Sequence, residues 1–149
     1  MFLWFVQKRI KRAFGDSPKY SEIENITYFY VNVFDHRLGN IQLYFEPCYI
    51  FITNALKEKE SNKVLVHCKY GSSRAATLVI YYLMKKSRLS LDDAIEFLKS
   101  IRPMIAPNRG FINQLRKSEI EIHGEIPGTN TRKLKILILI IFGTLVSWC

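Results

Sequence analysis

The chain has 149 residues, of which 48% are hydrophobic and 13% aromatic, so it can bury enough side chains for one packed domain. This composition excludes a disordered tail or a coil-only chain. Lysine and arginine number 22 against 13 aspartates and glutamates, and the net charge of +9 favours anionic partners. The three cysteines are too few for a disulfide scaffold, so we expect a reducing, cytoplasmic compartment.

The first residues, MFLWFVQKRIKRAF, place a short apolar run before a group of basic residues. A secretory signal has the opposite order and a longer apolar core, so this segment does not fit one. We therefore expect residues 1–20 to be an atypical basic and apolar segment that packs on the domain as a strand or a helix. The alternative is an amphipathic start that touches anionic lipid.

The next stretch of the chain alternates between strand and helix patterns. Residues 26–33 (ITYFYVNV) are aromatic and β-branched, which predicts a strand, and a polar loop follows at residues 35–40. Apolar residues recur at helical spacing over residues 41–56, and Pro47 indicates that this helix is kinked or begins there. The residues KVLVH at 63–67 predict a short buried strand.

Three helices are predicted in the second half of the chain. The first is apolar and runs through residues 72–86, the second spans residues 90–100 with Ser90 as its N-cap, and the third spans residues 109–122 and stops at Gly124. This order of strands and helices predicts an α/β domain. We expect a central, mostly parallel sheet that is flanked by helices.

The C-terminal part reads as a linker over residues 123–133 and an apolar tail over residues 134–149. Basic residues precede the tail, as the positive-inside rule requires of a membrane anchor, although the uncharged run is short for a complete span. The rival interpretation is a buried strand or helix that completes the core. Membrane contact through residues 134–149 therefore stays open as an alternative.

The segment VHCKYGSSR carries the clearest chemical signal, because a cysteine and an arginine are separated by five residues between a strand and a helix. The amides of such a turn point into a concave nest at the positive end of the helix, which binds phosphate and favours the thiolate form of Cys68. Arg74 can then hold two phosphate oxygens with its planar guanidinium. The rest of the predicted phosphate loop is His67, Lys69, Tyr70, Gly71, Ser72 and Ser73.

A thiolate that attacks phosphorus must expel an alkoxide or phenoxide, and this leaving group needs a proton. Asp35 follows the preceding strand and is the candidate general acid, which then serves as the base for the attacking water. Arg74, the amides and the helix dipole can supply the charge stabilisation, so we expect neither a metal nor another cofactor.

These residues and the blocks around them resemble the dual-specificity phosphatases of the protein tyrosine phosphatase superfamily. The signature appears as HCKYGSSR after VLV, and it is followed by AATLVIYYLM and by IRPMIAPNRGFINQL. The resemblance covers roughly residues 21–122, which we take as the catalytic domain, with a shortened N-terminal part. It implies a phosphatase-like fold, turnover of phosphotyrosine and phosphoserine/threonine in proteins, and a role for Asn108 in bracing the phosphate loop.

The chain departs from this family directly after the arginine, where it has Ala75 instead of the usual serine or threonine. That hydroxyl is thought to help the thiolate leave in the second step, so its loss implies slow hydrolysis of the phosphoenzyme.

Other interpretations of the same residues have to be weighed. Cys68 alone would more often be a small buried apolar residue, Asp35 could be an ordinary turn residue, and Ser73 could simply cap the helix. Two alternative functions also remain: a slow module that binds or traps phosphorylated partners, and a membrane-associated phosphoinositide phosphatase. We expect phosphorylated proteins as partners and no nucleic acid, because no groove-reading helix or base-stacking motif accompanies the basic charge.

Overall fold

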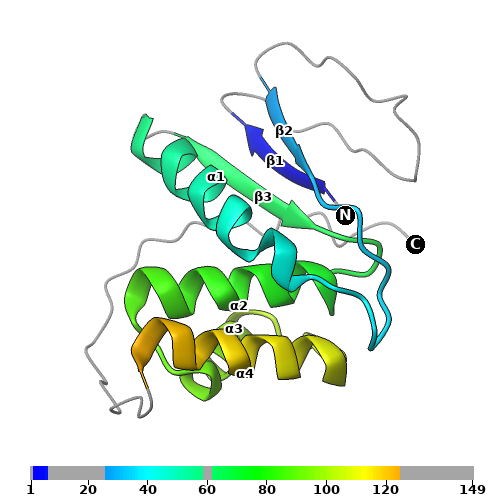
Figure 1. Cartoon of the computed structure of the whole chain (residues 1–149). Helices are drawn as coiled ribbons and strands as arrows, with labels where there is room; N and C mark the ends of the chain where they lie inside the picture. Colours follow the sequence, from blue (N-terminus) through cyan, green and yellow to red (C-terminus); the bar gives the residue numbers. More distant parts are fainter. Residues whose placement is uncertain (1, 7–25, 59–61, 125–149) are drawn as a thin grey trace.

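The structure is a computed structural model that describes residues 2–6, 26–58 and 62–124 (Figure 1). In chain order its elements are the strands β1 (Phe2–Val6) and β2 (Ile26–Tyr30), the 3-10 turn η1 (Gln42–Tyr44), the helix α1 (Phe45–Glu58), the strand β3 (Lys63–His67), and the helices α2 (Arg74–Ser87), α3 (Leu91–Ile101) and α4 (Arg109–His123).

The three described strands form one sheet in the order β2-β1-β3. The predicted α/β class is confirmed, but the prediction of a mostly parallel sheet is wrong for these strands. β1 is antiparallel to both neighbours and pairs Phe2 with Tyr30 on one side and with His67 on the other. The outer strands β2 and β3 therefore run in the same direction, and the expected parallel relationship is interrupted because the N-terminal strand lies between them.

Helix α2 is the centre of the fold. All its residues from Ala75 to Met84 are buried, because it packs against β3 and α1 on one side and against α3 and α4 on the other (Figure 1). Phe111 and Leu115 of α4 and Leu98 of α3 complete the core around it. A helix that is apolar on every face fits only such a central position, which explains the uninterrupted run AATLVIYYLM.

The helix boundaries follow the signals in the sequence. Pro47 lies in the first turn of α1, where its missing N–H costs no intrahelical hydrogen bond, so the helix begins near it and is not interrupted by it. The Ser90 hydroxyl accepts a hydrogen bond from the amide of Asp93 and caps α3. Gly124 ends α4 with a φ of +80°.

The predicted start of the linker, residue 123, is one residue too early, because His123 is still part of α4 and its ring forms a 2.9 Å hydrogen bond with the Leu89 carbonyl. Within the described ranges, none of the helices combines the length and the apolar character that crossing a bilayer requires. The predicted tail at residues 134–149 and residues 125–133 of the linker lie outside the described residues.

Candidate functional site

The predicted phosphate loop connects the end of β3 to the start of α2, as the sequence indicated. Cys68 follows the last strand residue and is a half-buried free thiol, while Arg74 is the first residue of the helix. Between them, Gly71 has a φ of +69°, a conformation that side-chain-bearing residues rarely adopt. This turn brings the chain directly into the positive end of α2.

Two groups from the segment after α3 support the phosphate loop from outside. The amide of Ala106 donates a 2.8 Å hydrogen bond to the carbonyl of Ser72. Arg102 lies so close to Gly71 that a Cβ there would be 2.8 Å from its guanidinium. Arg102 is the arginine of the RP pair in the block IRPMIAPN, and this contact was not predicted from the sequence. Within the loop, Lys69 and Tyr70 are exposed, with the ammonium 5.3 Å from the ring centroid.

His67 is a neutral support of the loop at physiological pH. Burial lowers the pKa of its imidazole to about 4, and a hydrogen bond with the Cys68 backbone opposes this shift only in part. The ring can therefore orient the start of the loop, as the sequence suggested, but it brings no positive charge to the thiol near neutral pH.

The two described cysteines lie in contrasting environments. Cys48 is 1% exposed within α1, and burial raises the pKa of its thiol, so this residue is an inert part of the core. Cys68 is half-buried and lies at the start of the loop that leads from β3 to α2. Of the described cysteines, only Cys68 thus has the surroundings of a nucleophile.

The fold brings Asp35 to the phosphate loop from a different part of the chain. Its carboxylate oxygen Oδ2 lies 3.6 Å from Nε of Arg74, and its Oδ1 accepts a 2.7 Å hydrogen bond from the Ser73 hydroxyl. The guanidinium of Arg74 also donates a 3.4 Å hydrogen bond to the Val33 carbonyl. The predicted acid and the predicted phosphate-binding arginine therefore lie side by side.

Asn108 joins the acid, the phosphate loop and α4. Its backbone amide donates a 3.2 Å hydrogen bond to the Ser73 hydroxyl, which agrees with the predicted bracing of the loop. Its side-chain oxygen caps α4 by accepting from the Phe111 amide at 3.0 Å, and its side-chain nitrogen donates to Oδ1 of Asp35 at 2.9 Å. The contact with Asp35 was not expected from the sequence.

Two further residues of α4 hold the loop around Asp35, which we call the acid loop (residues 34–40). A Cβ on Gly110 would be only 1.8 Å from the carbonyl oxygen of Arg37. The side-chain amide of Gln114 donates to the Gly39 carbonyl at 2.8 Å and accepts from the Gln42 amide at 2.9 Å. Both residues belong to the block PNRGFINQL, so this motif supports the acid loop, a role that was not predicted from the sequence. Figure 1 shows the chain after β2 descending past the end of β3 to these helix ends.

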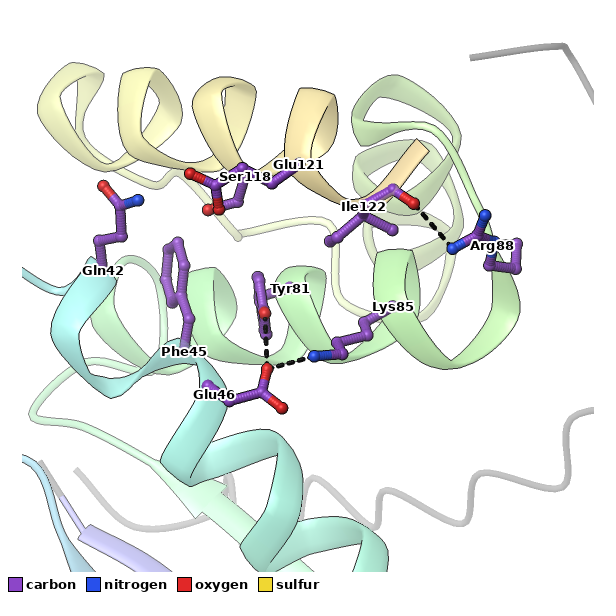
Figure 2. Close-up of a pocket in the computed structure, with 9 residues that line it drawn as sticks. All are labelled: Gln42, Phe45, Glu46, Tyr81, Lys85, Arg88, Ser118, Glu121 and Ile122. Atoms are coloured by element: carbon purple, nitrogen blue, oxygen red, sulfur yellow. Dashed lines mark hydrogen bonds and ion pairs between the residues drawn. The ribbon is translucent and has the colours of Figure 1, made fainter. Parts of the chain in front are cut away.

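A separate pocket of about 420 Å³ lies between α1, α2 and α4 (Figure 2). In it Glu46 accepts a 3.1 Å hydrogen bond from the Tyr81 hydroxyl and pairs with Lys85, while Arg88 donates to the Ile122 carbonyl at 2.7 Å. The residues that α2 contributes to it come from its second half, away from the phosphate loop. Because Lys85 and Arg88 already have partners within the pocket, it does not resemble a phosphate site.

Comparisons with known proteins show which family the chain is similar to. The family model described as "Dual specificity phosphatase, catalytic domain" matches residues 7–121. Dual specificity protein phosphatase 1 of Arabidopsis thaliana is 42% identical over 96 residues, which are 64% of this chain and 48% of that protein. Dual specificity protein phosphatase 1B of the same plant is 38% identical over 108 residues, or 72% of this chain and 62% of that protein.

Solved structures show the same similarity. The crystal structure of the human tyrosine phosphatase-like serine/threonine/tyrosine-interacting protein is 34% identical and superposes with a TM-score of 0.58, over 61% of this chain and 59% of that one. The chain spans about half the length of the curated relatives it matches. Because the family model covers most of the sequence, the chain belongs to the dual specificity phosphatase catalytic domain family.

Proposed function

We propose that the protein hydrolyses phosphate monoesters on tyrosine and on serine/threonine of proteins through a cysteinyl-phosphate intermediate. The observation that carries this proposal is the juxtaposition of Asp35 with Arg74 at the start of α2, directly after the turn that begins at Cys68. The candidate nucleophile and the anion-binding arginine lie at the two ends of the loop between β3 and α2, and the candidate acid lies beside the arginine. Nε of Arg74 is buried beside Oδ2 of Asp35, 3.6 Å away, and makes no hydrogen bond to a described residue.

The reaction proceeds in two steps. The Cys68 thiolate attacks phosphorus, the S–P bond forms, the ester P–O bond breaks, and protonated Asp35 gives its proton to the leaving oxygen. A water molecule then attacks the cysteinyl phosphate and gives a proton to the Asp35 carboxylate, which releases phosphate and restores the thiolate. Arg74 and the loop amides stabilise the charge of the transferring phosphoryl group in both steps.

Protein phosphates are favoured as substrates because the relatives that match this chain are named as protein phosphatases. Neither the trapping module nor the phosphoinositide phosphatase gains a specific supporting observation. A thiolate nucleophile needs reducing surroundings, so the proposal includes a cytoplasmic location. Membrane association through residues 134–149 stays an alternative to a purely cytoplasmic protein.

The decisive experiment is rapid mixing of the full chain with phenyl phosphate, with phenol and inorganic phosphate measured separately. We expect phenol release that is lost in Cys68→Ser, whereas Cys48→Ala, which removes the buried thiol, keeps it. Folding of each variant is checked by circular dichroism. Release by Cys68→Ser at the wild-type rate, or no release by a folded wild-type protein from phenyl phosphate and from phosphotyrosine and phosphoserine peptides, would reject the proposal.

Two matched substrates test the lipid alternative. A phosphotyrosine peptide and an inositol phospholipid in vesicles are supplied at equal phosphate concentration, and phosphate release is compared. Turnover of the peptide without turnover of the lipid supports a protein phosphatase. The reverse result would favour the phosphoinositide phosphatase.

A further inference from the structure

Asp35 is held by hydrogen bonds at one of its two carboxyl oxygens, whereas the other oxygen faces Arg74. Oδ1 accepts two hydrogen bonds, from the Ser73 hydroxyl at 2.7 Å and from the Asn108 side-chain amide at 2.9 Å. These two donors fill the lone pairs that an oxygen of this kind offers. Oδ2 accepts no hydrogen bond from a described residue in the structure and lies 3.6 Å from Nε of Arg74. Oδ2 is therefore the oxygen that faces the arginine expected to hold the phosphate.

The Ser73 hydroxyl forms a hydrogen bond with Asp35 and does not cap its own helix, α2. Ser73 occupies the N-cap position of α2, where a serine usually accepts a hydrogen bond from an amide of the first turn, yet its side chain makes no such bond. The residue is only 5% exposed, so its hydroxyl has little access to water. Helix α2 therefore lacks a side-chain cap, and the Ser73 hydroxyl donates its hydrogen bond to Asp35.

Asn108 uses both ends of its side chain, and no other N-cap residue could do the same. Its oxygen caps α4 through the Phe111 amide, which leaves the NH₂ group for Asp35. Serine and aspartate also cap helices well, but a serine is too short to span both contacts and an ionised aspartate has no proton to donate. The hydrogen bond to Asp35, together with the capping of α4, therefore explains why residue 108 is an asparagine.

Apolar packing contributes little to fixing the acid loop. Phe34 and Leu38, on either side of Asp35, are 84% and 81% exposed. The position of the carboxyl group thus depends on polar contacts with α2 and α4. Removal of one donor should leave the core intact and allow the carboxyl group to rotate or to move away from the leaving group.

We propose that Ser73 and Asn108 are positioning residues that anchor Oδ1 of Asp35, so that Oδ2 carries the proton given to the leaving oxygen. This inference rests on the proposed function. In the first step the Cys68 thiolate forms the S–P bond, the ester P–O bond breaks, and the proton on Oδ2 passes to the departing oxygen. Oδ1 keeps its two hydrogen bonds throughout, so the orientation of the acid is set before the substrate binds.

Leaving groups of different basicity provide the test, because a good leaving group departs without a proton and a poor one does not. Single-turnover phenol release from the full chain is measured with phenyl phosphate and with 2,4-dinitrophenyl phosphate. The variants are Ser73→Ala, which removes one donor, and Asn108→Ser, which keeps a capping hydroxyl but removes the NH₂ donor. Ser100→Ala and Asn113→Ala, at exposed helix positions, are the matched controls.

We expect each of the two variants to slow phenol release from phenyl phosphate about tenfold and to change the reaction of the dinitrophenyl ester less than about twofold, since general acid catalysis contributes about 10²–10⁴ in rate. In an Asp35→Asn background the same substitutions should have almost no further effect, because they act through a carboxylic acid that is no longer present. Thermal unfolding of each variant monitors folding, and the two substrates are compared within the same folded preparation.

The inference is overturned if both substrates slow equally, or if the losses persist at full size in the Asp35→Asn background. Either result would mean that Ser73 and Asn108 act on the phosphate loop and not on the acid. Absence of turnover by the folded wild-type protein with both esters overturns the proposed function and this inference with it. Failure of this inference and failure of the proposed function can be told apart, because the first is seen only in the variants and the second is seen in the wild-type protein.

Discussion

The carbonyl oxygen of Arg37 occupies the space in which a side chain on Gly110 would begin. A Cβ on that glycine would lie 1.8 Å from this oxygen and 2.7 Å from the Arg37 Cα, well inside contact distance. The acid loop and the first turn of α4 therefore touch through backbone atoms. This contact explains why a glycine follows two residues after Asn108: the missing side chain lets the acid loop approach the helix that holds Asp35.

Gly110→Ala should displace the acid loop or the start of α4. Because the added methyl group meets backbone and not a flexible side chain, we expect a loss of about 1–3 kcal/mol in the free energy of unfolding. Phenol release from phenyl phosphate should fall more than release from the dinitrophenyl ester. Urea unfolding and single-turnover kinetics measure both effects, with Asn113→Ala on the same helix as control. If neither the stability nor the rates change, the close contact between Gly110 and Arg37 does not contribute to folding or to catalysis.

Ala75 should make the second step of the reaction slow. It lies in the first turn of α2, is fully buried, and cannot supply the hydroxyl that the family usually places after the arginine. We expect wild-type protein to give a burst of phenol followed by slower steady turnover, and Ala75→Ser to raise the steady rate about tenfold while the burst rate stays the same.

The matched control for this prediction is Ala75→Gly, which changes the same position without adding a hydroxyl. A steady rate that rises equally in both variants would assign the effect to local flexibility. A wild-type protein whose steady rate equals its burst rate would show that the hydroxyl is dispensable here.

Alkylation should distinguish the two described cysteines. Burial raises the pKa of the Cys48 thiol and keeps reagents away, whereas Cys68 is half-buried in the loop between β3 and α2. With iodoacetamide at pH 7, peptide mapping by mass spectrometry should show modification of Cys68 at least about ten times faster than of Cys48. Inorganic vanadate or phosphate should slow the modification of Cys68 alone. Equal reactivity of the two thiols in folded protein would contradict the assignment.

His67 should make the stability of the protein depend on pH. Its pKa falls from 6.5 to about 4 on folding because burial disfavours the charged ring. The unfolded chain therefore takes up this proton first, so the stabilisation is complete above pH 6.5 and is lost as the pH falls towards 4. The largest effect of such a shift is about 3 kcal/mol, since one pKa unit corresponds to about 1.4 kcal/mol.

The measurement is the free energy of urea unfolding at several pH values between 7.5 and 4.5. His67→Gln should give a flatter dependence than wild type, and His36→Gln, at an exposed position, should give the wild-type slope. The slopes are compared because the substitution also removes the hydrogen bond with the Cys68 backbone. Parallel curves for wild type and His67→Gln would mean that this ring titrates alike in the folded and unfolded states.

Local structure could be predicted well from the sequence, because local rules determine it. The apolar run after Arg74 could only be a buried helix, and Ser90 and Gly124 marked helix ends through capping rules that involve neighbouring residues. The spacing of Cys68 and Arg74 likewise predicted the loop between β3 and α2, which the structure contains. Each of these features depends on residues within a few positions of one another.

The tertiary structure decided what depends on contacts between distant segments. The insertion of β1 between β2 and β3 could not be predicted, because backbone hydrogen bonds are available to any strand and side-chain patterns do not choose the neighbour. The sequence predicted Asp35 as the candidate acid, but not that Ser73 and Asn108 donate hydrogen bonds to one of its oxygens, since these two residues are the N-caps of α2 and α4. A hydroxyl at a helix start predicts a cap, and only the folded chain shows that this one donates to a carboxyl group on another loop.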